Sequence, residues 1–243
     1  MVDAAPRIAR AGLAFAAGLT LSFSSPFPSA VAQQGAPAAV RPETHLSADM
    51  LYRGWRASQL LGREAATKDG KALGTIRNVL VGSDAKITAV LVERQAAGQR
   101  SEFVFRLPWE RIDAARLPKD IVTGAASGDL PELDIFAGDT SAPKMPREFA
   151  VTEVVGEYAR LQAGQGYGYV SDIVFSRDGT MIAVLITRGL GQEGGTYAFG
   201  FPGFLGQWRP DMSYYGLPYV TAGQATAAGL RVDPKRFEDG GAG

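Results

Sequence analysis

Short runs of alternating apolar and polar residues, separated by turns rich in glycine and aspartate, occupy most of the chain after residue 60. Residues 73–81, 87–93 and 102–107 each fit a β-strand of ordinary length. Residues 87–93 are apolar on both faces, which favours a closed or covered sheet. Pro108 is expected to end the third strand, because proline has no amide hydrogen to donate to a neighbouring strand. The pattern therefore predicts a mainly β protein.

The same pattern of strands occurs twice. A shift of 94 residues aligns residues 60–109 with residues 154–203 without a gap, and 11 of the 50 positions are identical. The identities are mainly turn glycines and alternating apolar residues, together with one aspartate turn and one proline. Because no set of reactive side chains is duplicated, the repeat is a folding unit rather than a repeated active site.

The motifs within the two copies resemble those of the PRC-barrel family. In the first copy they are Leu60–Gly62, Asp69–Gly74, Asp84, Ile87–Val92 and Pro108–Trp109. The second copy departs from them at Ala163–Gly164, where Asp-Gly is usual, and at Gly203, where tryptophan is usual. The resemblance implies two tandem small β-barrels that dock proteins rather than catalyse a reaction. Members of the family include the extramembrane domain of the photosynthetic reaction-centre H subunit.

These features divide the chain into six parts. They are a signal peptide at 1–32, a disordered lead-in with a short helix at 33–54, the first barrel-like unit at 55–114, a linker at 115–147, the second unit at 148–220 and a flexible tail at 221–243. Ser47 is the expected N-cap of the short helix. We expect Trp55 to pack on the first unit and residues 133–136 to add a short strand.

The first 32 residues fit a secretory signal. Two arginines precede an apolar run at 11–23, which is too short to cross a bilayer comfortably, and Ala30–Ala32 has the small residues of a cleavage site. We expect cleavage near Ala32 and a periplasmic location. An uncleaved signal that anchors the protein in the membrane and a buried N-terminal helix are the alternatives.

Composition narrows the function further. The formal charge is zero, with 25 basic and 25 acidic residues, and cysteine is absent. A neutral balance gives no sign of a nucleic-acid partner. The absence of cysteine excludes disulfides, thiolate metal sites and a cysteine nucleophile. The fold must therefore be held by a buried core.

Three motifs that suggest chemistry lack the context they need. His45 is the only histidine and has no partner at a metal-ligand or catalytic spacing. Gly189–Gly194 spells the dinucleotide fingerprint, but an alternating strand follows it where a helix N-terminus would be needed. Ser83–Lys86 matches Ser-x-x-Lys within a turn between strands. We therefore expect no catalytic residue, no metal and no cofactor.

Residues 197–219 contain eight of the 23 aromatic residues. The first three alternate and are expected in the core. The candidate partner-binding residues are Phe204, Trp208, Arg209, Tyr214 and Tyr215. Rigid aromatic side chains beside an arginine are typical of protein-binding hot spots. The alternative is that these aromatic residues cap the second barrel or seal the seam between the units.

The sequence thus predicts an exported, non-enzymatic protein that docks an envelope protein partner. The main alternative is a small-molecule-binding or envelope-stress protein that uses the cleft between the two units. That alternative predicts a concave pocket lined by residues of both copies. An enzyme is the third hypothesis, and it requires a convergent acid–base pair.

Overall fold

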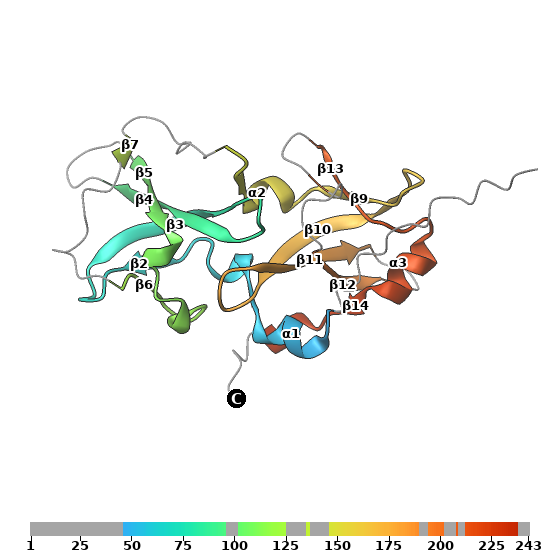
Figure 1. The fold of residues 1–243 in the computed structure, drawn as a ribbon, viewed down its shortest axis with the longest axis horizontal. Helices are drawn as coiled ribbons and strands as arrows, with labels where there is room; N and C mark the ends of the chain where they lie inside the picture. The colour runs from blue at the N-terminus through green and yellow to red at the C-terminus, as the bar shows by residue number, and fades with distance from the viewer. Residues whose placement is uncertain are drawn as a thin grey trace, which may run out of the picture. The chain divides into compact units, whose positions relative to one another are not determined.

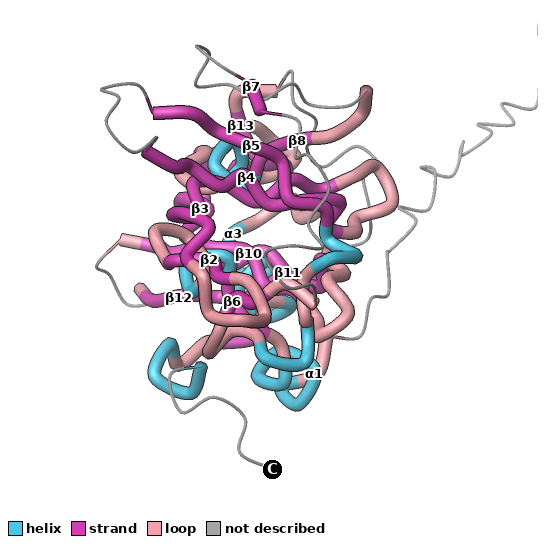
Figure 2. Tube along the Cα trace, turned by 90° about the vertical axis from the view of Figure 1, so that its left-hand side faces the viewer, coloured by secondary structure: helices cyan, strands magenta, loops and turns pink. Residues whose placement is uncertain are grey.

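The computed structural model describes residues 46–95, 102–124, 135–136, 146–189, 194–201, 208 and 212–237. These residues form a mainly β protein with two mixed sheets of seven strands each (Figure 1), which confirms the predicted class. The helices are short, and most of them connect strands (Figure 2). All of the described residues fall within one unit, residues 41–243. The expected signal peptide lies outside the described residues.

The first sheet has the strand order β6-β2-β3-β4-β5-β7, with β8 paired to β3. The strands are β2 (Glu64–Ala66), β3 (Ala72–Val81), β4 (Ile87–Gln95), β5 (Glu102–Pro108), β6 (Ile121–Val122), β7 (Ile135–Phe136) and β8 (Phe149–Ala150). Only β2 and β6 pair in parallel. β5 ends at Pro108 as expected, and β7 falls within the short strand predicted at 133–136.

The second sheet has the order β13-β9-β10-β11-β12-β14, with β1 paired to β10. The strands are β1 (Trp55–Arg56), β9 (Tyr158–Arg160), β10 (Gly166–Phe175), β11 (Met181–Arg188), β12 (Gly195–Gly200), β13 (Tyr214–Gly216) and β14 (Leu230–Arg231). The helical segments of the described chain are α1 (Ala48–Arg53), η1 (Ala57–Gln59), η2 (Trp109–Arg111), η3 (Ala114–Arg116), α2 (Val151–Val154), α3 (Ala222–Ala228) and η4 (Pro234–Phe237). Ser47 caps α1 by accepting a hydrogen bond from the amide of Met50, as predicted.

The two sheets repeat one topology. β9 and β10 lie exactly where a shift of 94 residues moves β2 and β3, and β13 pairs with β9 in parallel as β6 pairs with β2. The structure therefore bears out the internal repeat. Within the described residues, no strand pair joins the two ends of either sheet, so neither closes by hydrogen bonding into the barrel that the sequence predicts.

Each copy gives its leading strand to the other copy's sheet. β1 precedes the first copy but pairs with β10, placing Trp55 opposite Phe175. β8 precedes the second copy but pairs with β3, placing Phe149 opposite Val81. The expectation that Trp55 packs on the first unit holds for its ring, which stacks on Trp109 with centroids 6.1 Å apart, but the strand that carries Trp55 joins the second sheet.

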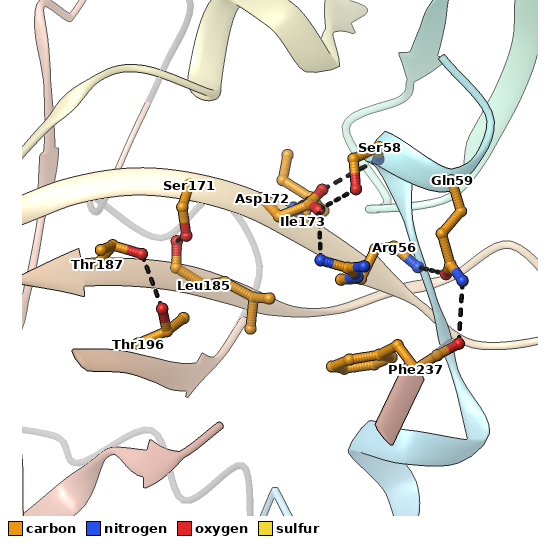
Figure 3. Close-up of polar contacts among 10 residues, drawn as sticks. All are labelled: Arg56, Ser58, Gln59, Ser171, Asp172, Ile173, Leu185, Thr187, Thr196 and Phe237. Carbon is orange, nitrogen blue, oxygen red and sulfur yellow. Dashed lines mark hydrogen bonds and ion pairs between the residues drawn. The ribbon is translucent and has the colours of Figure 1, made fainter. Parts of the chain in front are cut away.

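Equivalent side chains hold both exchanged segments. Asp172 in β10 accepts hydrogen bonds from the hydroxyl and the amide of Ser58, which follows β1 (Figure 3). At the equivalent place in β3, Asn78 donates to the hydroxyl of Thr152, which follows β8. Each exchanged strand is therefore followed by a residue whose hydroxyl is bound to the opposite sheet.

The two copies also meet directly. The amide of Ile87 donates to the carbonyl of Gly179 at 2.9 Å, and the amide of Met181 donates to the carbonyl of Ala85 at 2.8 Å. Ile87 and Met181 are equivalent under the 94-residue shift, and so are Ala85 and Gly179, so each of these hydrogen bonds is the counterpart of the other. The two copies are therefore related by an approximate two-fold axis at this point. The largest core cluster correspondingly contains residues of both sheets, including Trp55, Phe105, Phe149 and Phe175.

The predicted boundaries need two corrections. The linker at 115–147 contributes β6 and β7 to the first sheet. The tail is structured as far as Phe237, because α3, β14 and η4 pack Ala225 and Phe237 into the core and β14 pairs with β12. The described parts of both segments thus pair with a sheet.

Candidate functional site

The predicted partner-binding residues divide into buried, partly exposed and undescribed positions. Trp208 is 2% exposed and Tyr215 is 1% exposed, whereas Tyr214 is partly exposed. Phe204 and Arg209 lie outside the described residues. Burial also raises the pKa of the Tyr215 phenol far above its ordinary value. The structure therefore corrects the exposed-surface interpretation for Trp208 and Tyr215.

Trp208 and Tyr215 serve the packing alternative instead. The Trp208 ring meets the edge of Phe149 at a centroid distance of 5.0 Å, and Phe149 belongs to the strand that joins the first sheet. Tyr215 lies opposite Ala159, which is fully buried. Trp208 thus helps to seal the seam between the copies, as the alternative supposed.

An exposed aromatic surface lies on the outer face of the second sheet. Tyr169 in β10 is 58% exposed and lies opposite Tyr158 in β9, which is 37% exposed. Tyr214 in β13 lies opposite Tyr158 on its other side. Three tyrosines therefore form one cross-strand row over three neighbouring strands. We call these three residues together with Arg160 the tyrosine surface.

Strand alternation explains why these side chains face outward. In β9, Ala159 points into the core, so Tyr158 and Arg160 point away from it. In β13, Tyr215 takes the buried position and Tyr214 the outer one. The pairing of β13 with β9 thus buries Tyr215 and leaves Tyr214 partly exposed.

Neighbouring groups hold the tyrosine surface in place. The rings of Tyr158 and Tyr169 meet edge to face with centroids 5.0 Å apart. The Arg160 guanidinium lies 5.0 Å from the Tyr214 ring and 5.8 Å from the Tyr158 ring. A Cβ atom at Gly166 would overlap the Tyr158 side chain, so glycine at this position leaves space for the ring. The result is a packed patch in which the Arg160 guanidinium contacts two tyrosine rings.

The row continues as hydroxyl groups across the sheet. Thr187 in β11 lies opposite Tyr169, and Thr196 in β12 lies opposite Thr187. The two threonine hydroxyls are 2.8 Å apart (Figure 3). The outer face thus changes from aromatic to polar along one line of residues.

A comparison of the two copies could have found this surface in the sequence. Tyr158 and Tyr169 stand where the first copy has Glu64 and Thr75, which are also paired across two strands. The equivalent outward positions are therefore polar in one copy and aromatic in the other. The cluster of aromatic residues at 197–219 does not include Tyr158 and Tyr169, because they lie far from it in sequence.

A separate concave site lies near the first copy. The pocket has a volume of about 800 Å³. Its lining residues are Tyr52, Arg53, Gly54, Trp55, Gln59, Arg63, Ala115, Arg116, Leu117, Pro118, Lys119, Asp120, Arg177 and Phe237. Arg177 belongs to the second copy, so the pocket is lined from both copies, as the ligand-binding alternative predicts.

Other features of the described residues bear on the remaining hypotheses. Gly189 is the first residue of the fingerprint segment, and the strand β12 rather than a helix follows the segment. Within the described ranges, no three histidine, cysteine, aspartate or glutamate side chains gather as a metal site. None of the described helices is long and apolar enough to cross a membrane.

Comparison with known proteins leaves the chain without an assigned family: it matches no protein-family model and no curated protein. The PRC-barrel resemblance therefore depends on the sequence motifs alone and stays a prediction.

Proposed function

We propose that this protein is an exported, non-enzymatic, PRC-barrel-like module that docks an envelope protein partner through the tyrosine surface. The observation that carries the proposal is the cross-strand row of Tyr158, Tyr169 and Tyr214 on the outer face of a sheet. Export is supported by the signal-like residues 1–32, and the docking role by the PRC-barrel resemblance.

The chemistry of the surface favours a protein partner. Tyrosine and arginine are enriched at binding hot spots, and tyrosine offers a large contact area and a polar group at a small entropic cost. Here the ring contacts and the Arg160 stacking restrict the side chains before a partner arrives, which reduces the cost of ordering them.

The partner surface can be described further. Arg160 has no described carboxylate within salt-bridge distance, and its contacts are with aromatic rings. A partner that presents an acidic side chain beside apolar groups would match both the cation and the rings.

A second candidate function is the binding of a small molecule. The observation that favours it is the pocket of about 800 Å³. Its lining includes Trp55 and, from a turn of the second copy, Arg177. Its volume lies in the range of ordinary ligand sites.

Chemical cross-linking in the native cells, followed by mass spectrometry, tests the docking proposal. Wild-type protein should yield a recurrent partner, and Tyr158→Ser with Tyr169→Ser should lose it while the circular dichroism spectrum stays unchanged. The matched control is Glu64→Ser with Thr75→Ser, which changes the equivalent paired positions of the first copy. Equal recovery from both double variants, or no recurrent partner from the wild type, would contradict the proposal.

A further inference from the structure

We propose that the pocket beside the first copy binds an anion that carries phosphate groups. The inference names the ligand chemistry of the second candidate function, and it does not rest on the tyrosine surface, which shares no residue with the pocket lining. Three features carry it: the charge of the lining, the way that charge is held, and an unsatisfied donor in the wall.

The pocket lining is strongly cationic, although the chain as a whole has a formal charge of zero. It contains Arg53, Arg63, Arg116, Lys119 and Arg177, and among the described residues of the lining only Asp120 carries a carboxylate. This carboxylate already pairs with Arg116 at 3.8 Å. Because like charges around one cavity raise each other's energy, an entering anion would relieve this repulsion.

Arg63 is held in place without being neutralised. Its guanidinium donates to the carbonyl of Pro118 at 3.2 Å and to the carbonyl of Lys119 at 2.7 Å. These acceptors carry no net charge, so the positive charge remains available. The same bonds secure the loop that contributes Arg116 and Lys119 to the lining.

Arg177 also sits on an ordered turn. The neighbouring carboxylate of Asp178 accepts hydrogen bonds from the hydroxyls of Ser176 and Thr180, and these bonds lower the pKa of Asp178. Among the described residues, neither Arg177 nor Lys119 has a carboxylate within salt-bridge distance. Both are therefore suited to contact a ligand.

Trp55 supplies the independent observation. This side chain lines the pocket and is 1% exposed, and no described residue accepts a hydrogen bond from its indole Nε1–H. Leaving a buried donor without an acceptor costs free energy, which an oxygen atom that reaches the donor would recover. Tyr52 and Phe237 extend the wall with rings whose centroids are 5.0 Å apart.

The lining favours phosphate over a single carboxylate. Guanidinium groups bind phosphate oxygens in pairs, and several cations suit a group with more than one negative charge. A volume of about 800 Å³ leaves room for an organic body against the aromatic wall. A soluble phosphate ester and a lipid phosphate headgroup share this chemistry.

Calorimetry on the purified exported protein tests the proposal with two probes at constant ionic strength. The probes are inorganic pyrophosphate and vesicles of phosphatidic acid in phosphatidylcholine. Lys119→Ala with Arg177→Ala should weaken binding by about tenfold or more, because two charge-assisted contacts are lost. Lys68→Ala with Lys71→Ala removes the same charge outside the pocket lining and should change binding less than about twofold.

The two probes separate the ligand sources. Pyrophosphate binding that depends on the pocket cations supports a soluble phosphate ester, and vesicle binding alone with the same dependence supports a lipid headgroup. No binding of either probe, or equal loss in the two double variants, overturns the proposal. Tyr158→Ser with Tyr169→Ser should bind both probes normally, so failure of the docking proposal remains distinguishable.

Discussion

The two copies differ most clearly where a tryptophan meets a turn glycine. Gly179 has φ +82°, and a Cβ atom there would lie 2.7 Å from the Trp109 ring. The equivalent residue of the other copy is Ala85, with φ +64°, and the residue equivalent to Trp109 is Gly203. Glycine is therefore required at position 179 for two reasons: the backbone is left-handed there, and the Trp109 ring leaves no room for a Cβ atom.

Substitution of this glycine should be costly. We expect Gly179→Ala to lower the free energy of unfolding by about 2–4 kcal/mol, from the left-handed conformation and the overpacked ring together. Ala85→Gly is the matched control and should change it by less than about 1 kcal/mol. Urea denaturation measures both, and an equal effect of the two substitutions would show that Trp109 does not constrain the turn.

The buried phenol of Tyr215 predicts a loss of stability at alkaline pH. Its pKa is raised in the folded protein by burial, whereas the unfolded chain ionises near the ordinary value of 10.0. The stabilisation that the protonated phenol gives the folded protein is fully present below this ordinary pKa and is lost as the pH rises above it. Tyr215→Phe should reduce the slope of stability against pH in this range, and an unchanged slope would contradict the burial of this side chain.

Single residues also show where sequence reasoning reached its limit. The alternation of Tyr197, Phe199 and Phe201 correctly predicted burial, because a strand of several residues defines its own faces. β13 has only three residues, so its pairing with β9 decides which of its side chains face the core. That is why Tyr214 and Tyr215 could not be separated from the sequence.

Among the elements, the exchanged strands β1 and β8 connect the two copies. The sequence repeat predicted equivalent units but not which sheet each leading strand would join, because both sheets offer the same edge. The ion pair between Arg106 in β5 and Glu148 secures the start of β8, with Nη1 and Oε2 2.7 Å apart. In the second sheet, Nη1 of Arg56 in β1 lies 3.9 Å from Oδ2 of Asp172.

The Asp172 contact allows a test of the exchanged strand. We expect Asp172→Ala to cost about 3–5 kcal/mol, because Arg56 and the Ser58 amide lose a buried partner. Asp172→Asn should cost only about 1–2 kcal/mol, since Asn78 fills the equivalent position in the first copy. Amide hydrogen exchange at Trp55 and Arg56 should accelerate in the alanine variant, and slow exchange there would show that Asp172 does not hold β1.

At the scale of the whole molecule, two similar halves share one core. Because each half completes the other's sheet, we expect fragments 46–124 and 146–237 to be unfolded when expressed separately and to form a complex when expressed together. Circular dichroism and gel filtration measure both states. A cooperatively folded single fragment would show that the exchanged strands are dispensable.

The candidate sites were predicted from the sequence only in outline. A pocket lined from both copies was expected, but its cationic lining was not, because Arg63, Lys119 and Arg177 are far apart in sequence and meet only in the folded chain. The aromatic docking surface was expected on the second copy, but Trp208 and Tyr215 lie in the core. The tyrosine surface instead depends on the register of β9 with β10 and β13.

Photo-cross-linking from single positions in the native cells tests the docking role most directly. A photoreactive phenylalanine analogue at position 169 should give an adduct of one defined mass. The same analogue at position 75, the equivalent outward position of the first copy, should give none. Adducts of the same mass from both positions, or from neither, would contradict docking through the tyrosine surface.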